Sequence, residues 1–238
     1  MEDKEQLKNR FKELAARYER TGIAQFTKFL NMEEQSVLLG LKLGCALEGG
    51  YEQAERRIAV FGEAESLPIA CVRVFPAAKR FSDELTHRDF LGSVMALGIN
   101  REVLGDIITV DNEAYLICLD SIADYITENL TKVRHTTVCC EHSAVPDAIK
   151  DGGEERSLVV PSERLDAVIA AVWKLSREDA KTLVEKGLVY INSKQTVKAG
   201  ATVPENAAVS VRGKGRFCFL GLERETKKGK LRVRVRVN

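Results

Sequence analysis

Residues 231–237, near the C-terminus, alternate strictly between apolar and basic side chains. The apolar residues are Leu231, Val233, Val235 and Val237, and the arginines between them are Arg232, Arg234 and Arg236. A period of two places alternate side chains on opposite faces of a β-strand. The segment therefore predicts a strand with one apolar face and one arginine face.

Two interpretations of these arginines are open, and they are compatible. In the first, the segment is an edge strand whose charges prevent pairing with other chains. In the second, the arginines contact phosphates, together with the lysines at 227, 228 and 230 just before them. The sequence favours the second interpretation.

The charge of the chain is distributed very unevenly. The net charge is only +1, but residues 162–238 carry 17 Lys and Arg against 8 Asp and Glu, a balance of +9. Residues 1–161 hold the remaining 19 basic and 27 acidic residues, a balance of −8. A basic C-terminal part beside an acidic body indicates a polyanionic partner, although charged faces are often simply solvated.

Residues 1–66 predict an N-terminal α+β domain. An amphipathic helix is indicated by apolar residues at helical spacing, namely Leu7, Phe11, Leu14, Ala15 and Tyr18, and Thr21-Gly22 should end it. A second helix is expected near Asn31, which can cap it, with acidic residues in its first turn.

Residues 67–149 predict a middle domain with the order β-α-β-β-α-β. Strands are expected at 69–74, 106–110, 113–119 and 136–140, and helices at 85–97 and from about 121 to 130. This is the ferredoxin-like arrangement found in many RNA-recognition domains. The aromatic residues with which RRM domains stack bases are absent from these strands.

Residues 150–161 mix proline, glycine and charge and predict a linker. After it, Ser162 is expected to cap one helix and Ser176 a second, with Gly187 as a left-handed stop. Short strands are expected at 188–191 and 209–211, and a tight turn at 198–200. The fold class predicted for the whole chain is therefore α+β.

Residues 162–216 resemble the alpha-L RNA-binding domain, a module named after a small-subunit ribosomal protein and also present in tyrosyl-tRNA synthetases and pseudouridine synthases. The resemblance rests on Arg164-Leu165-Asp166, Ser176-Arg177, Gly187, 189–192 (VYIN) and Lys198-Ala199-Gly200. It implies an alpha-L domain with a basic C-terminal strand over 162–238. In that family the start of the second helix and the following loop contact RNA.

The predicted RNA-binding residues combine this resemblance with the positions of basic side chains. Arg164 and Asp166 are equally compatible with a structural role that pins the first helix. The full predicted set is Arg164, Lys174, Ser176, Arg177, Lys181, Lys186, Asn192, Lys194, Lys198, Arg212, Lys214, Arg216, Arg232, Arg234 and Arg236.

Over roughly residues 25–238 the chain resembles the YlmH-type RNA-binding proteins of bacteria. The residues that carry this resemblance are 49–57 (GGYEQAERR), 87–107 (HRDFLGSVMALGINREVLGDI) and the C-terminal module. The resemblance implies a non-enzymatic cytoplasmic protein that binds rRNA or tRNA on the large ribosomal subunit in ribosome quality control. Neither DNA nor a membrane is an expected partner.

His87-Arg88-Asp89 spells a kinase catalytic motif, but the required asparagine is replaced by Val94 and no glycine-rich loop precedes it. Two interpretations are left. In one, His87 and Asp89 cap a helix and Arg88 is solvated; in the other, His87 and Arg88 contact RNA or the ribosome.

No cofactor, metal or catalytic residue is expected. Cys139-Cys140-Glu141-His142 lacks the ligand spacing of structural zinc, and nucleotide-binding glycine motifs are absent. The six cysteines show no CxxC pair and are expected to be reduced thiols, consistent with a cytoplasmic protein.

The alternative to a non-enzymatic RNA-binding protein is an RNA-modifying enzyme of the pseudouridine-synthase type that uses the alpha-L domain for targeting. A weaker third option is a protein–protein adaptor that works through the acidic half.

Overall fold

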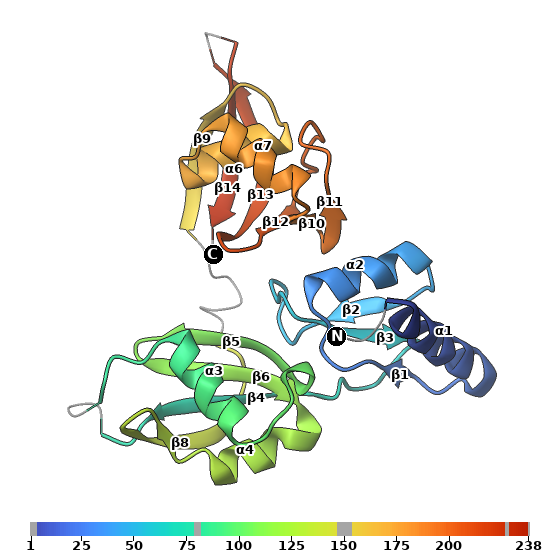
Figure 1. The fold of residues 1–238 in the computed structure, drawn as a ribbon, viewed down its shortest axis with the longest axis vertical. Coiled ribbons are helices and arrows are strands. Elements are labelled where there is room, and N and C mark those ends of the chain that lie inside the picture. The colour runs from blue at the N-terminus through green and yellow to red at the C-terminus, as the bar shows by residue number, and fades with distance from the viewer. Residues whose placement is uncertain (1–3, 79–81, 147–153, 227–228, 238) are drawn as a thin grey trace. The chain divides into compact units, whose positions relative to one another are not determined.

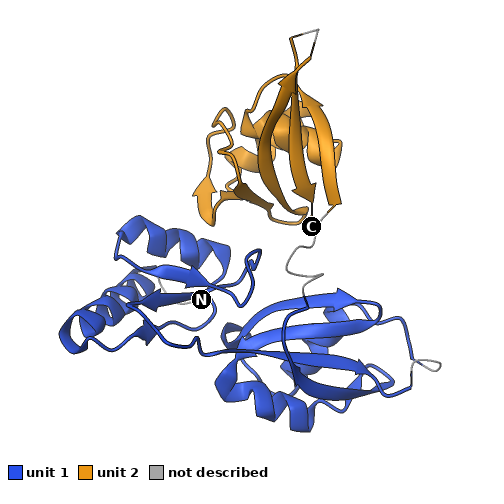
Figure 2. Cartoon of the chain, turned by 180° about the vertical axis from the view of Figure 1, so that it is seen from behind, with its two compact units in different colours: residues 1–150 blue, residues 151–238 orange. Residues whose placement is uncertain are grey.

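The computed structural model describes residues 4–78, 82–146, 154–226 and 229–237 (Figure 1). The chain divides into two compact units, residues 1–150 (unit 1) and 151–238 (unit 2), shown in blue and orange in Figure 2. Unit 1 includes both of the predicted domains, 1–66 and 67–149. Within the described residues, no helix is both long enough and apolar enough to cross a membrane.

The first part of unit 1 is a three-stranded sheet with two helices. Its elements are α1 (Lys4–Thr21), β1 (Gln25–Phe26), α2 (Met32–Leu41), β2 (Ala46–Glu48) and β3 (Ile58–Phe61), in the sheet order β1-β3-β2. The predicted stripe on α1 supplies the buried residues Leu7, Phe11 and Ala15. Asn31 caps α2 as predicted, and Glu34 completes a capping box with it.

The second part of unit 1 is a five-stranded sheet with helices (Figure 1), and the sheet and the helices pack around one hydrophobic core. Its elements are β4 (Ile69–Pro76), α3 (His87–Ala96), η2 (Arg101–Val103), β5 (Leu104–Val110), β6 (Glu113–Leu119), η3 (Asp120–Ile122), α4 (Ala123–Asn129), β7 (Lys132–Val133) and β8 (Thr136–Ser143). The strand order is β5-β6-β4-β8-β7. Asp111 and Asn112 join β5 to β6 with φ angles of 49° and 65°, the left-handed conformation of a tight hairpin turn.

Asp106 ties the two parts of unit 1 together. Its carboxylate accepts hydrogen bonds from the Tyr51 hydroxyl (2.8 Å) and from the backbone N–H groups of Glu55 (2.6 Å) and Arg56 (3.0 Å). The guanidinium of Arg56 donates in turn to backbone carbonyls, those of Phe29, Arg101 and Leu104. The segments 49–57 and 87–107, both prominent in the sequence, therefore meet at this junction.

An apolar cluster adds to the junction. It joins residues of the first part to residues of the five-stranded sheet, and its buried members are Phe29, Ile58, Val60, Cys71, Ile117 and Val145. A shared core and a shared hydrogen-bonded carboxylate explain why residues 1–150 form one unit.

Unit 2 is a six-stranded antiparallel sheet with two helices packed on one face (Figure 1). Its elements are β9 (Glu154–Val160), α6 (Leu165–Trp173), α7 (Arg177–Glu185), β10 (Val189–Ile191), β11 (Lys194–Thr196), β12 (Ala207–Val211), β13 (Gly215–Glu225) and β14 (Leu231–Val237). The strand order is β11-β10-β12-β13-β14-β9. Val233 and Val235 are fully buried beneath the helices, so the apolar face predicted for residues 231–237 is confirmed.

The predicted linker 150–161 is corrected by strand β9. Residues 154–160 pair with β14 from Val237 to Leu231 and form the edge of the sheet, while 150–153 lie outside the described residues. β14 is consequently an inner strand, and the edge-strand interpretation of its arginines is wrong. The proline, glycine and charge of 150–161 predict a linker, but an edge strand also tolerates charged side chains on its exposed face, so composition does not distinguish the two. The lysines at 227 and 228 also lie outside the described residues.

We expect Asp106→Ala to lower the free energy of unfolding of unit 1 by about 2–4 kcal/mol, because three donors lose their acceptor. Tyr51→Phe removes only one of the three hydrogen bonds and should cost about 1 kcal/mol. Urea denaturation followed by circular dichroism measures both values. Equal losses in the two variants would show that the backbone N–H contacts of Asp106 do not stabilise the junction.

Candidate nucleic-acid interface

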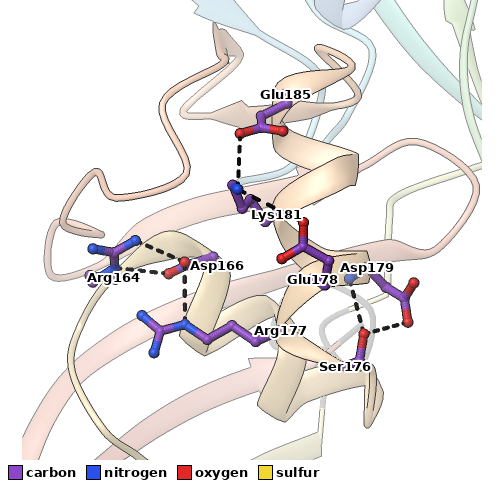
Figure 3. Close-up of polar contacts among 8 residues, drawn as sticks. All are labelled: Arg164, Asp166, Ser176, Arg177, Glu178, Asp179, Lys181 and Glu185. Carbon is purple, nitrogen blue, oxygen red and sulfur yellow. Dashed lines mark hydrogen bonds and ion pairs between the residues drawn. The ribbon is translucent and has the colours of Figure 1, made fainter.

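A buried carboxylate, that of Asp166, links the starts of the two helices of unit 2. Asp166 lies in the first turn of α6 with its side chain only 3% exposed. Arg164 contacts both of its oxygens, through Nε at 3.1 Å and Nη2 at 2.9 Å, and Arg177 donates from Nε at 3.3 Å (Figure 3). One acid therefore orients two arginines that come from the starts of α6 and α7.

The backbone around Asp166 explains its position. The N–H of Leu165 donates to the carbonyl of Ala201 at 2.8 Å, and the N–H of Asp166 donates to that of Ala199 at 3.1 Å. The start of α6 thus lies against the turn formed by Lys198-Ala199-Gly200. A Cβ on Gly200 would come within 3.3 Å of the Arg164 guanidinium, so the absence of a side chain there allows this close approach.

Burial and charge act against each other on Asp166. Burial alone would raise the pKa of Asp166, but the hydrogen bonds and charges of Arg164 and Arg177 hold that pKa below its ordinary value. The carboxylate is therefore ionised at neutral pH. Two guanidiniums and one carboxylate leave a net charge of +1, and the two arginine side chains are still 46% and 51% exposed.

This arrangement suits an anionic ligand. The arginines are fixed in direction by a buried partner, so less side-chain entropy is lost when they bind. Guanidinium groups with exposed nitrogens bind phosphate in a bidentate manner. We call Arg164, Arg177 and the adjacent Lys198 the helix-side surface.

The helix starts differ in part from the sequence prediction. Arg164, not Ser162, is the N-cap residue of α6, because the strand-like approach of Arg164 to Thr202 extends up to the helix. The predicted caps of α7 are confirmed: the Ser176 hydroxyl accepts from the N–H of Asp179 at 3.0 Å, and Gly187 has a φ of +69°.

Lys181 lies between two acids on α7. Its ammonium is 3.8 Å from carboxylate oxygens of both Glu178 and Glu185 (Figure 3). Such exposed pairs contribute at most about 1 kcal/mol, but they compete with a phosphate for the lysine. Lys181 is therefore a weaker candidate than Arg177 on the same helix.

The remaining predicted residues on this side have mixed roles. Lys174 and Lys186 are exposed residues at the C-terminal ends of α6 and α7. Asn192 is occupied structurally: its Oδ1 accepts from the N–H of Ala208 at 2.8 Å, and its φ of 46° forms the β10–β11 turn. Lys194 is exposed at the start of β11.

The sheet arginines are not brought together with the helix-side surface. Arg232, Arg234 and Arg236 alternate with the valines buried under α6 and α7, so they project from the opposite face of the sheet. Arg216 lies on β13, and Arg212 and Lys214 flank the β12–β13 turn. The predicted residues thus divide between two faces of unit 2, which spacing along the chain could not reveal.

His87 and Arg88 lie in the first turn of α3 in unit 1. His87 does not cap this helix, so that part of the capping interpretation is wrong, and Thr86 is the N-cap residue. The Asp89 carboxylate accepts a hydrogen bond from the N–H of Thr86 at 2.9 Å, so Asp89 does take part in the cap. Burial, followed by the charge of Arg101, lowers the pKa of His87. His87 is therefore neutral at pH 7.

Comparisons with known proteins found a matching family model, a similar sequence and a similar structure. The family model described as "Putative RNA-binding domain in YlmH" matches residues 70–147, the five-stranded sheet of unit 1. "Ribosome-associated protein quality control protein P2" of Bacillus subtilis (strain 168) is 33% identical over 219 residues, covering 88% of this chain and 85% of the relative. The solved structure "Cell division protein ylmH from Streptococcus pneumoniae" is 20% identical with a TM-score of 0.48, covering 63% of this chain and 95% of its own.

We expect Asp166→Asn to destabilise unit 2 by about 1–3 kcal/mol at pH 7, because two arginines lose an ionised partner. The folded-state pKa of Asp166 is depressed, so its contribution is complete above the unfolded value of about 4 and is lost as pH falls through the lower folded value. Thermal melts of both proteins between neutral and acid pH test this sign. A stability difference that grows on acidification would contradict it.

Proposed function

This chain belongs to the YlmH family of RNA-binding proteins, and we propose that it binds structured RNA through the helix-side surface of unit 2. The observation that carries the proposal is the Asp166-centred pair of arginines, Arg164 and Arg177. Their guanidiniums are half exposed, fixed in direction and in net excess over the acid that holds them. Phosphate groups of a folded RNA match these properties.

We also assign fold names to two parts of the chain. Unit 2 is proposed to be an alpha-L RNA-binding domain, since α6, α7 and the 198–200 turn bring its characteristic residues side by side. The second part of unit 1 is proposed to be a ferredoxin-like domain. Its strand order β5-β6-β4-β8 and helices on one face support that assignment.

The target is proposed to be rRNA or tRNA on the large ribosomal subunit. The Bacillus subtilis relative is named for ribosome-associated protein quality control, and its similarity extends over most of both chains. A cytoplasmic protein that acts on stalled nascent chains without catalysing a reaction fits that name. The direct experiment is co-sedimentation with purified small and large subunits, with and without bound tRNA. Binding that saturates, depends on salt and is confined to the large subunit is expected.

An RNA-modifying enzyme is the second candidate, because Arg164-Leu165-Asp166 has the letters of a catalytic motif of pseudouridine synthases. The environment of Asp166 argues against this role, since its carboxylate is buried and held by two arginines. A nucleophile needs access to the base it attacks. An assay for modified bases in rRNA and tRNA distinguishes the candidates, and a modified base would favour the enzyme.

We expect the double variant Arg177→Gln with Lys198→Gln to bind an RNA hairpin roughly tenfold or more weakly. The slope of log K against log salt should fall by about 2, about 1 for each lost phosphate contact. The matched control is Arg17→Gln with Arg20→Gln, which removes the same charge from exposed positions of α1. Equal affinities for both variants would place the RNA contacts elsewhere.

A further inference from the structure

The sheet of unit 2 has one face that α6 and α7 do not cover. Figure 2 shows its strands in front of the two helices. The apolar residues Phe217, Phe219, Val233 and Val235 point to the helices and form the core. Side chains that alternate with them lie on the opposite face.

Strand register places five arginines on that opposite face. Arg236 pairs with Cys218 on β13, and Arg216 precedes Cys218 by two residues. Arg232 pairs with Arg224, across two irregularities in the β13–β14 ladder. Directly paired residues share a face, so two adjacent strands present one set of arginines. We call it the arginine face, and it consists of Arg216, Arg224, Arg232, Arg234 and Arg236.

This arrangement works against the stability of the sheet. Arg224 and Arg232 stand directly opposite each other, and like charges in such a pair are destabilising. Within the described residues, the buried Nε of Arg232 has no hydrogen-bond partner, and neither Arg224 nor Arg234 forms an ion pair. A carboxylate does reach Arg236, from Glu155 at 2.7 Å. The charge of Glu155 also interacts with Arg234, whereas within the described residues the paired Arg224 and Arg232 form no ion pair that offsets their repulsion.

We propose that the arginine face is a second RNA-binding surface, independent of the helix-side surface, so that unit 2 holds one RNA segment on each face. The inference rests on the proposed function for the identity of the ligand as RNA. Its own basis is the strand register of β13 and β14.

The chemistry of the face favours RNA phosphates. Every cation in the set is an arginine, the side chain that binds phosphate in a bidentate manner. Arg232, Arg234 and Arg236 recur every second residue, about 6.7 Å apart, and form a row that an extended backbone of phosphates can follow. Val159, which pairs with Arg232, is the large exposed apolar residue that the register places beside the row, so a hydrophobic partner has little to bury there.

A single substitution separates the function of the face from its contribution to folding. Arg224→Glu converts a like-charged cross-strand pair into an opposite-charged one. The melting temperature should rise by a few degrees. Affinity for an RNA hairpin should fall, because a phosphate contact is replaced by a repulsive charge. A lower melting temperature would contradict the cost inferred for the arginine pair.

The number of bound RNA segments tests the second surface directly. Isothermal titration of the full chain uses a GC-rich RNA hairpin closed by a tetraloop as the probe. We expect two hairpins per unchanged chain and one per chain for Arg224→Gln with Arg234→Gln. The control Arg17→Gln with Arg20→Gln should still bind two.

Each outcome has a distinct meaning. One hairpin per chain with the same affinity in unchanged protein and in the Arg224/Arg234 variant overturns the second surface and leaves the proposed function intact. Full binding by the Arg177/Lys198 variant refutes the helix-side surface alone. If the Arg224/Arg234 variant keeps both hairpins but loses binding to polyglutamate, the face recognises acidic protein and the proposal fails.

Discussion

The ion pairs of Asp166 with Arg164 and Arg177 are the interaction on which the rest of unit 2 depends. They join the start of α6 to the start of α7, and backbone hydrogen bonds at the same place join α6 to the 198–200 turn. A buried carboxylate is costly unless it is fully paired, and removing one partner leaves an uncompensated charge. The same contact therefore fixes the geometry of the helices and aims two guanidiniums at solvent. Structural and binding roles of Arg164 are not alternatives here, because the contact that pins the side chain also orients it.

A second constraint comes from the sheet having helices on one side only. Covering one face gives the valines of β14 a core, while its arginines remain on the other face. β9 completes this arrangement, since it pairs with β14 along its length and turns a terminal strand into an inner one. Unit 2 thus places basic side chains on both faces of its sheet.

Unit 1 uses its polar residues differently. Asp106 accepts three hydrogen bonds from the 51–56 segment, and Arg56 donates to backbone carbonyls, so the most distinctive stretches of the sequence are engaged in holding two sheets together. Arg101 is also satisfied by carbonyls, and burial followed by the charge of Arg56 lowers its pKa to about 10. A distinctive sequence therefore marks a structural junction as readily as a binding site.

The sequence alone determined the local elements. Apolar periodicity located α1 and β14, and side-chain chemistry located the Asn31 and Ser176 caps and the Gly187 stop, because these signals act within one or two turns of chain. The sequence also assigned Arg164, Asp166, Arg177 and the 198–200 turn to one module, through the resemblance to the alpha-L domain. Only the tertiary structure decided which elements pair: strand β9 lies where the composition of 150–161 predicts a linker, and the basic residues of unit 2 divide between two faces of its sheet. Strand pairing and shared cores depend on contacts between residues far apart in the chain, and a local pattern carries no information about which partner a strand or face will meet.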